Sequence, residues 1–434
     1  MMYRSKTRFW AWLLSGVSLA LGALHFVHLR TLWGLSLWVP KMLAGALSPW
    51  LAVLGAVGAL LGAAGRAPLA IAAGIGGAWA SARYVWRTVT ALGDFERAFG
   101  LRWAERISEA QRQGMLKERW TWFPGRAAEA RLARDVLFAR VPGTERPLLC
   151  DVWQPPPGVA PSGLAFVYLH GSGWYLSDKD VGTRPFFRHL ASQGHVIVDV
   201  AYRLCPEADM WGMVGDVKRA VAWIKANAAD YGVDPGCVVL AGGSAGAHLA
   251  LLAAYTPDHP ELTPDELAGV DVTVRAVVAF YGPTDLRAII DYNEDLIRWQ
   301  GENSRPAVHI APQGRFGWGA QQLDRTLSSR CTPKDLVGGV PEEVPEMYDL
   351  GSPLHHAGPG CPPTFLVHGT HDLLVPVASV RALHRKLLAA DVPVVYLELP
   401  ETDHAFDLVL PRFSPPAQVA WYEVERFLAL VDQA

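Results

Sequence analysis

Apolar residues follow two different patterns along this chain, and the change falls near residue 134. Before it, three long runs carry no charged side chain, at residues 9–29, 42–65 and 67–82. After it, short apolar runs alternate with amphipathic stretches. Long uncharged runs are typical of membrane helices, whereas short buried runs between amphipathic stretches predict strands and helices of an α/β domain.

The three long runs predict an N-terminal membrane region over residues 1–87. They are rich in Gly and Ala, which let membrane helices pack closely, and Trp33, Trp38, Trp79 and Trp86 fall near their ends. We expect three membrane helices, with two as the alternative because the third run is short and Gly-rich. Two other interpretations compete: the first run is a cleaved signal peptide, or all three are buried helices of a soluble protein.

The cations that flank these runs bear on membrane orientation. With three spans, one side carries Arg4, Lys6, Arg8 and Arg66, and the other carries Arg30, Lys41, Arg83, Arg87 and Arg97. The positive-inside rule then leans weakly toward a cytoplasmic C-terminal domain, and the lean is the same with two spans. The sequence therefore predicts a multi-pass membrane protein whose orientation is not fixed.

Residues 88–133 mix aromatic and charged side chains in a pattern compatible with amphipathic helices. Such a segment fits a linker lying on the membrane surface, or a lid folded over an active site. An ordinary helix packed on the following domain remains a third interpretation.

From residue 134 to 434 the pattern predicts an α/β fold with an open, mostly parallel sheet. The segment 287–360 has no clear strand, is dense in Pro and Gly, and is interpreted as an inserted excursion. The expected strands are 135–141, 148–154, 164–169, 195–202, 237–241, 274–281, 364–368 and 394–399, and the expected helices are 214–227, 247–255, 376–390 and 415–431.

Charge and cysteine usage exclude several functions. The chain has 39 Lys+Arg against 42 Asp+Glu, so nothing favours a nucleic-acid partner. Five cysteines are scattered singly, without the spacing of a zinc site, and are interpreted as free thiols. That dispersed set argues mildly for a reducing compartment.

Ser244 stands at the centre of Gly242-Gly243-Ser244-Ala245-Gly246, between an expected strand and an expected helix. Small residues on both sides of a serine allow a sharp, strained turn that points the hydroxyl out of the sheet. An ordinary glycine-rich connection fits this pattern equally well when it stands alone, so the remaining candidate residues decide between the two.

A serine hydroxyl becomes a good nucleophile when an oriented base removes its proton. Asp372 and His404 each follow the carboxyl end of a later expected strand, and functional residues of open α/β sheets gather at those ends. The order Ser244, Asp372, His404 is that of α/β-hydrolase triads. His371 and Asp403 are the nearest alternatives; Asp403 is disfavoured because it adjoins His404 in sequence.

The run His170-Gly171-Ser172-Gly173-Trp174 follows another expected strand. Acyl transfer passes through a tetrahedral oxyanion, which backbone N–H groups stabilise when no side chain obstructs them. Gly171 and Ser172, together with Ala245 after the candidate nucleophile, are therefore the expected oxyanion hole.

From about residue 135 to 430, the chain resembles the hormone-sensitive-lipase-like branch of the α/β-hydrolases, which comprises carboxylesterases and acetyl-hydrolases. The resemblance rests on the motifs just described and on Ala201-Tyr202-Arg203-Leu204-Cys205-Pro206-Glu207, Asp216-Val217 with Trp223, Tyr231-Gly232-Val233-Asp234-Pro235, His368-Gly369-Thr370-His371-Asp372 and Asp403-His404-Ala405-Phe406. Two positions depart from the family pattern. Ser172 replaces the middle glycine of the oxyanion loop, and Gly243 replaces the acid that precedes the serine in many relatives.

These features predict a membrane-anchored serine hydrolase that cleaves carboxylic esters of a lipophilic small molecule or lipid. Ser244, Asp372 and His404 would be catalytic, and no metal or organic cofactor is expected. The same residues would also serve an acyltransferase or an amide deacetylase. A non-catalytic membrane scaffold with a degenerate hydrolase domain is the alternative from another class. Oligomeric state is left open.

Overall fold

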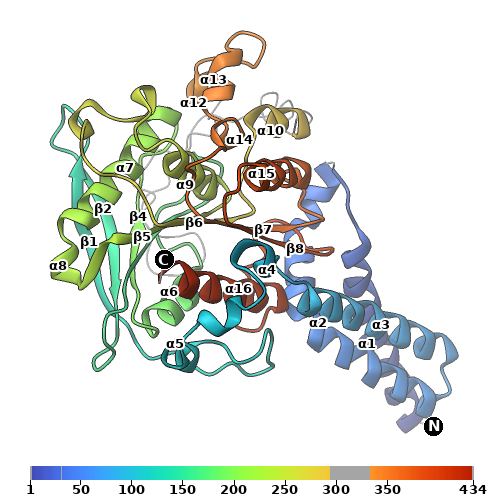
Figure 1. Ribbon diagram of the computed structural model, residues 1–434. Coiled ribbons are helices and arrows are strands. Elements are labelled where there is room, and N and C mark those ends of the chain that lie inside the picture. Colours follow the sequence, from blue (N-terminus) through green and yellow to red (C-terminus); the bar gives the residue numbers. More distant parts are fainter. Residues whose placement is uncertain (1, 31, 294–332, 433–434) are drawn as a thin grey trace.

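Eight strands form one sheet at the centre of the computed structural model, which describes residues 2–30, 32–293 and 333–432 (Figure 1). In chain order they are β1 Arg131–Arg140, β2 Pro147–Gln154, β3 Gly163–Leu169, β4 Val196–Val200, β5 Val233–Gly243, β6 Ala276–Phe280, β7 Thr364–Gly369 and β8 Val394–Leu399. All eight coincide with the expected strands. The strands are continuous runs of Val, Ile and Leu because helices cover both faces of the sheet, so the side chains on both faces are buried.

The spatial order is β1-β2-β4-β3-β5-β6-β7-β8. The β1–β2 and β2–β4 pairs are antiparallel, and every later neighbouring pair is parallel. The prediction of an α/β fold with a mostly parallel sheet is therefore confirmed. Parallel pairing brings the carboxyl ends of β3, β5, β6, β7 and β8 to one edge of the sheet.

Helices cover the two faces of the sheet in separate layers (Figure 1). One layer contains α7 Met210–Ala226, α9 Ala245–Tyr255 and α15 Val377–Ala389, and the other contains α6 Arg184–Ala191 and α16 Pro415–Val431. The pattern did not predict α6, which has only eight residues. The described parts of the excursion, 287–293 and 333–360, contain no strand. Short helices run through or into it: α10 Leu286–Tyr292, α12 Pro333–Val337, α13 Pro345–Leu350 and α14 Pro353–His356.

Residues 88–133 form a packed, mainly irregular segment. Its helical turns are short, at α4 Phe95–Phe99, a 3₁₀ turn Trp103–Arg106, and α5 Glu109–Gly114. The segment docks on α16, where Leu116 N–H donates to Glu425 Oε1 at 2.7 Å and Thr121 N–H donates to Gln418 Oε1 at 2.8 Å. Gly100 caps the end of α4, and Gly114 is the last residue of α5. The amphipathic pattern therefore does not extend into one long helix.

Three helices form a bundle that projects from the β8 side of the domain, with the N-terminus at its far tip (Figure 1). They are α1 Met2–Ala23, α2 Leu32–Gly65 and α3 Pro68–Thr90, and a short 3₁₀ turn Leu24–Phe26 follows α1. Small residues allow close contact: Ser18 Oγ donates to Leu51 O at 2.9 Å, and a Cβ on Gly74 would lie 2.6 Å from Gly55 O. Such packing is typical of helices in a membrane.

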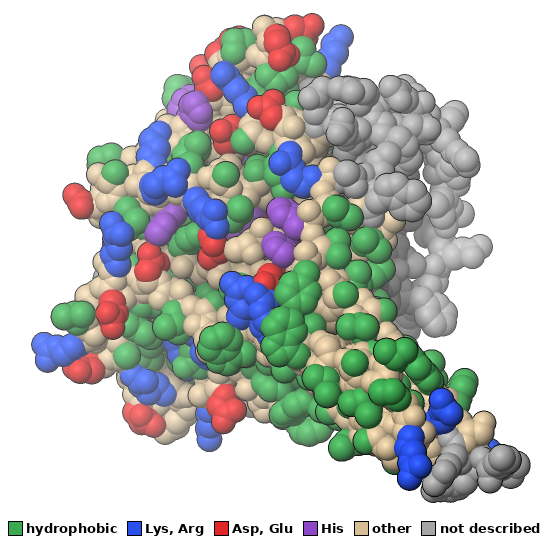
Figure 2. All heavy atoms as spheres, turned by 90° about the vertical axis from the view of Figure 1, so that its right-hand side faces the viewer, with side chains coloured by type: hydrophobic (Ala, Val, Ile, Leu, Met, Phe, Trp, Pro, Cys, Tyr) green, Lys and Arg blue, Asp and Glu red, His purple; other side chains and the backbone are tan. Residues whose placement is uncertain are grey.

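The face of this bundle seen in Figure 2 is apolar along most of its length. Exposed side chains include Phe9, Trp10, Leu60, Leu69 and Trp79, each more than half exposed. Two stretches, Ser5–Phe26 and Ser48–Gly65, are long and apolar enough to cross a membrane, judged by length and composition only. The third expected run, 67–82, lies in α3 and is not among them. These two helices weakly indicate a membrane region.

The cysteines correct one expectation. Cys150, Cys237 and Cys361 are free thiols, but Cys205 is disulfide-bonded, so the interpretation of five free thiols is wrong at that position. Cys331 lies outside the described residues. Because disulfides persist in oxidising compartments, the cysteine pattern no longer supports a reducing one.

The bundle packing predicts that Gly74→Ala destabilises the protein. Its methyl group would collide with the Gly55 backbone, and overpacking of this kind costs about 1–3 kcal/mol. We expect a lower unfolding temperature in detergent. Gly16→Ala is the matched control, since a Cβ there meets nothing within 4 Å. Equal unfolding temperatures for the two variants would contradict this view of the bundle.

Candidate active site

Ser244 lies between the end of β5 and the start of α9, with φ 53° and ψ −122°. This backbone conformation is uncommon for a residue with a side chain. The flanking glycines explain it: a Cβ on Gly242 would lie 2.6 Å from Gly246 O, and one on Gly246 would lie 2.5 Å from His170 O. The turn therefore requires glycine at both positions and leaves the half-buried Ser244 side chain at the sheet edge.

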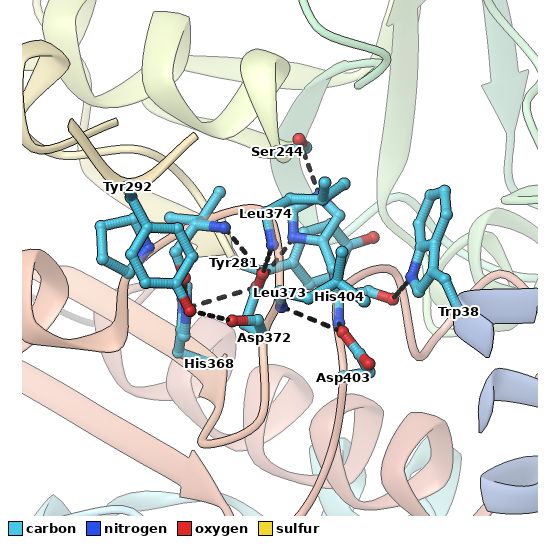
Figure 3. Close-up of polar contacts among 12 residues, drawn as sticks. Trp38, Ser244, Tyr281, Tyr292, His368, Asp372, Leu373, Leu374, Asp403 and His404 are labelled. Carbon is cyan, nitrogen blue, oxygen red and sulfur yellow. Dashed lines mark hydrogen bonds and ion pairs between the residues drawn. The ribbon is translucent and has the colours of Figure 1, made fainter. Parts of the chain in front are cut away.

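Ser244, His404 and Asp372 form a continuous hydrogen-bonded row (Figure 3). His404 Nε2 lies 2.9 Å from Ser244 Oγ, and His404 Nδ1 lies 2.8 Å from Asp372 Oδ2. Asp372 follows β7 and His404 follows β8. The structure thus brings the three predicted residues together from the ends of three parallel strands.

Asp372 is held in a way that favours its charged form. Burial alone would raise its pKa, but the His404 and His368 imidazoles and backbone hydrogen bonds hold the pKa below its usual value. Its Oδ1 accepts from Leu374 N–H at 2.9 Å and from Val375 N–H at 2.8 Å. A fixed carboxylate of this kind orients the imidazole through Nδ1–H.

The two neighbouring alternatives lie elsewhere. His371 stacks on His28 with ring centres 4.9 Å apart. Asp403 Oδ2 pairs with Lys41 Nζ of α2, and its Oδ1 accepts from the His404 N–H at 2.8 Å. Neither side chain bonds to the His404 ring, whereas Asp372 does.

The expected oxyanion residues border the same turn. A Cβ on Gly171 would lie 2.9 Å from Gly243 O and 3.1 Å from Ser244 Cβ, so this loop runs directly against the elbow. Ser172 has φ 90°, and its hydroxyl lies 2.8 Å from Ser177 Oγ. Ala245 is the first residue of α9, so its N–H has no acceptor within the helix. Gly171 thus lies against the Ser244 elbow, and Ala245 follows Ser244 directly in the chain.

Sequence reasoning missed a second layer beneath the histidine. The Tyr281 ring lies 4.6 Å from the His404 ring, and its hydroxyl donates to Asp407 Oδ1 at 2.5 Å. Burial raises the pKa of Asp407 to about 6, and the Tyr281 hydrogen bond offsets part of that rise. Tyr281 directly follows β6, and Asp407 lies three residues after His404. These positions in the sequence are the only signals that could have placed the two residues near His404.

Sequence reasoning also missed contacts from the bundle. Trp38 Nε1–H donates to His404 O at 3.1 Å, and Lys41 pairs with Asp403. No spacing in the chain predicts them, since more than 360 residues separate the partners. Within the described ranges, no group of three or more His, Cys, Asp or Glu is arranged to hold a metal ion.

Comparisons with known proteins find matches in sequence and in fold. Residues 150–311 match the family model BD-FAE. The chain is 33% identical over 288 residues to the probable carboxylic ester hydrolase LipM of Mycobacterium tuberculosis, covering 65% of this chain and 58% of LipM. It is 30% identical over 307 residues to the esterase LipQ of the same organism, covering 70% of this chain and 64% of LipQ. The chain thus spans less than two thirds of these relatives' length.

A solved structure supports the fold. The butyrate-bound esterase 2 of Thermogutta terrifontis is similar over 70% of this chain and 93% of its own, with TM-score 0.50 and 22% identity. The chain has an α/β-hydrolase fold, and residues 150–311 match the BD-FAE family model. In sequence the chain is similar to the mycobacterial carboxylic ester hydrolases.

The environment of Asp407 predicts a pH dependence of stability. A carboxyl whose pKa is higher in the folded protein stabilises the fold below its unfolded pKa, and that contribution is lost as pH rises to about 6. The wild type should therefore lose up to about 3 kcal/mol relative to Asp407→Asn between about pH 4 and pH 6. Unfolding temperatures of both proteins across this range measure it. If the unfolding temperatures of the wild type and Asp407→Asn changed with pH in parallel, the raised pKa of Asp407 would be contradicted.

Proposed function

We propose that this protein is a membrane-anchored serine hydrolase that cleaves carboxylic esters of a lipophilic small molecule or lipid. The observation that carries the proposal is the hydrogen-bonded row from Ser244 through His404 to Asp372. The names of the mycobacterial relatives, a carboxylic ester hydrolase and an esterase, support the ester as the substrate class. This chemistry needs no metal and no organic cofactor.

In the first half-reaction, Ser244 Oγ attacks the ester carbonyl carbon while His404 Nε2 takes the hydroxyl proton. Asp372 stabilises the imidazolium that forms, because its carboxylate faces Nδ1–H. The developing oxyanion is stabilised by the N–H groups of Gly171, Ser172 and Ala245. His404 then gives the proton to the leaving alcohol, and the acyl group remains on Ser244.

In the second half-reaction, water attacks the acyl-enzyme and His404 acts as the base. The tetrahedral intermediate collapses to the free acid, and the proton returns to Ser244. If an alcohol replaced that water, the same residues would transfer the acyl group instead, and an amide in place of the ester would give a deacetylase. Hydrolysis is preferred because the relatives bear hydrolase names.

The substrate is lipophilic because of where the site lies. Trp38 of the apolar bundle contacts the loop that carries His404, so the candidate site adjoins the helices that we assign to the membrane. We propose that residues 1–87 are the membrane region, that 88–133 form a linker docked on α16, and that 134–434 are the catalytic domain with an inserted excursion at 287–360.

Two observations bear on which side of the membrane the catalytic domain occupies. The cations flanking the spans lean toward a cytoplasmic domain, but the two sides differ by one residue. The disulfide at Cys205 favours an oxidising compartment. We give the disulfide more weight and propose a catalytic domain outside the cytoplasm.

The proposed nucleophile predicts that Ser244→Ala loses p-nitrophenyl ester hydrolysis by about 10⁴-fold or more. Purified full-length protein in detergent is assayed with acyl chains of increasing length. A fluorophosphonate probe should label the wild type and not the variant. Full activity in Ser244→Ala would remove the assignment.

The same assay separates the alternatives. Added alcohol acceptor should leave free acid as the main product, whereas an ester product would identify an acyltransferase. An acetylated amide tested in parallel identifies a deacetylase. Absence of both labelling and turnover in folded wild type would favour the non-catalytic scaffold.

Membrane anchoring predicts that the protein stays with membranes after alkaline carbonate washing and is released by detergent. In a bacterial host, a C-terminal alkaline phosphatase fusion should be active and a C-terminal green fluorescent protein fusion dark, because the domain is exported. Release by carbonate would contradict the anchor. The reverse fusion pattern would place the domain in the cytoplasm.

A further inference from the structure

Two side chains of α2 reach the loop that carries His404. Lys41 Nζ pairs with Asp403 Oδ2, and Trp38 Nε1–H donates to the His404 carbonyl oxygen at 3.1 Å (Figure 3 shows Trp38). Trp38 and Lys41 are three residues apart on one helix and therefore lie on the same face. This face of α2 meets the candidate active site directly.

Asp403 connects both loops of the Asp372–His404 pair. Its Oδ1 accepts from the His404 N–H at 2.8 Å and from the Leu373 N–H at 3.1 Å. Leu373 directly follows Asp372. One carboxylate thus fixes the backbone on both sides of the bond between His404 Nδ1 and Asp372, and Lys41 holds that carboxylate from the bundle.

The Lys41–Asp403 pair is enclosed, with side chains 5% and 3% exposed. A buried carboxylate that loses its partner tends to take up a proton or to move toward water. Either change would weaken its two hydrogen bonds to the loops. Asp403 is therefore a good backbone acceptor here because an ammonium group faces it.

The neighbouring residues of the loop are also held from the bundle. Glu401 accepts hydrogen bonds from Arg83 at 2.6 Å and from Arg87 at 2.5 Å, and Tyr84 OH lies 3.0 Å from Thr402 Oγ1. These three contacts come from α3. The run 401–404 thus receives a polar contact from the bundle at every residue.

We propose that Lys41 and Trp38 are positioning residues of the hydrolase, so that docking of the bundle sets the geometry of the Asp372–His404 pair. This inference rests on the proposed function, since it assigns these residues a role in the Ser244 reaction. The bundle is then a structural part of the active site as well as an anchor.

The test measures kcat and KM for a short p-nitrophenyl ester with full-length protein in detergent. The rate is divided by the concentration of active sites, which is determined by fluorophosphonate labelling. Lys41→Met should lower kcat about tenfold or more with KM little changed, because small displacements of catalytic groups are costly. The double variant Lys41→Met/Asp403→Asn should recover most of the loss. Asparagine keeps the Oδ1 acceptor for both backbone N–H groups and removes the unpaired charge.

The matched control is Lys225→Met. Lys225 of α7 pairs with Asp271 at 2.6 Å, has a side chain only 11% exposed and contacts no site residue, so kcat should not change. Trp38→Phe keeps an aromatic ring without the N–H donor and should lower kcat several-fold. If Lys41→Met does not fold, the kcat of Trp38→Phe tests the positioning role instead.

The outcomes separate this inference from the proposed function. Wild-type hydrolysis that does not depend on Ser244 would overturn the proposed function. Ser244-dependent hydrolysis with wild-type kcat in both Lys41→Met and Trp38→Phe would overturn the positioning role alone. A drop in kcat for Lys41→Met that the double variant does not recover would also overturn it, because the charge on Asp403 would then not be the cause.

Discussion

The close backbone contact of β5, α9 and the loop after β3 is the constraint on which the site depends. At Gly246 a Cβ would lie 2.5 Å from His170 O, and at Gly171 one would lie 2.9 Å from Gly243 O. Strand, helix and loop therefore meet without side chains between them. This contact leaves Ser244 at φ 53° and brings the loop after β3 against the Ser244 Cβ. One packing event thus positions Ser244 and the loop beside it, whereas His404 and Asp372 come from the ends of other strands.

Parallel pairing of β5, β6, β7 and β8 supplies the imidazole and its partners. Asp372 and His404 follow neighbouring strands, and Tyr281 follows the strand between the nucleophile and the acid. Two of the buried carboxyl groups near His404, those of Asp372 and Asp407, lie in different environments. Imidazole and backbone contacts keep the pKa of Asp372 low, whereas burial raises that of Asp407 to about 6. Opposite environments thus favour the charged form of Asp372 beside the ring and disfavour the charged form of Asp407 next to Tyr281.

The sequence predicted the parts of this arrangement that depend on local pattern. All eight strands form where Val, Ile and Leu runs predicted them, and Ser244, Asp372 and His404 meet because strand ends of a parallel sheet converge. Their catalytic roles remain predictions. Local pattern did not predict α6, whose eight residues are too few for a clear periodicity, or the irregular course of 88–133. Nor did it predict the Cys205 disulfide. Tyr281, Lys41 and Trp38 could not be found this way, because their relation to His404 exists only after the sheet and the bundle have packed.

The burial of the Lys41–Asp403 ion pair is poorly explained by its contribution to the stability of the fold, so another role must be considered. Desolvation of two charges offsets much of their attraction, so a buried ion pair contributes little net free energy compared with apolar residues of similar size. An apolar contact between α2 and the loop would dock the bundle at least as well. What apolar residues cannot provide is a charged acceptor for two backbone N–H groups, one beside His404 and one beside Asp372. The cost of burying the pair is therefore best explained by geometry at the candidate site, which links the helical bundle to that site.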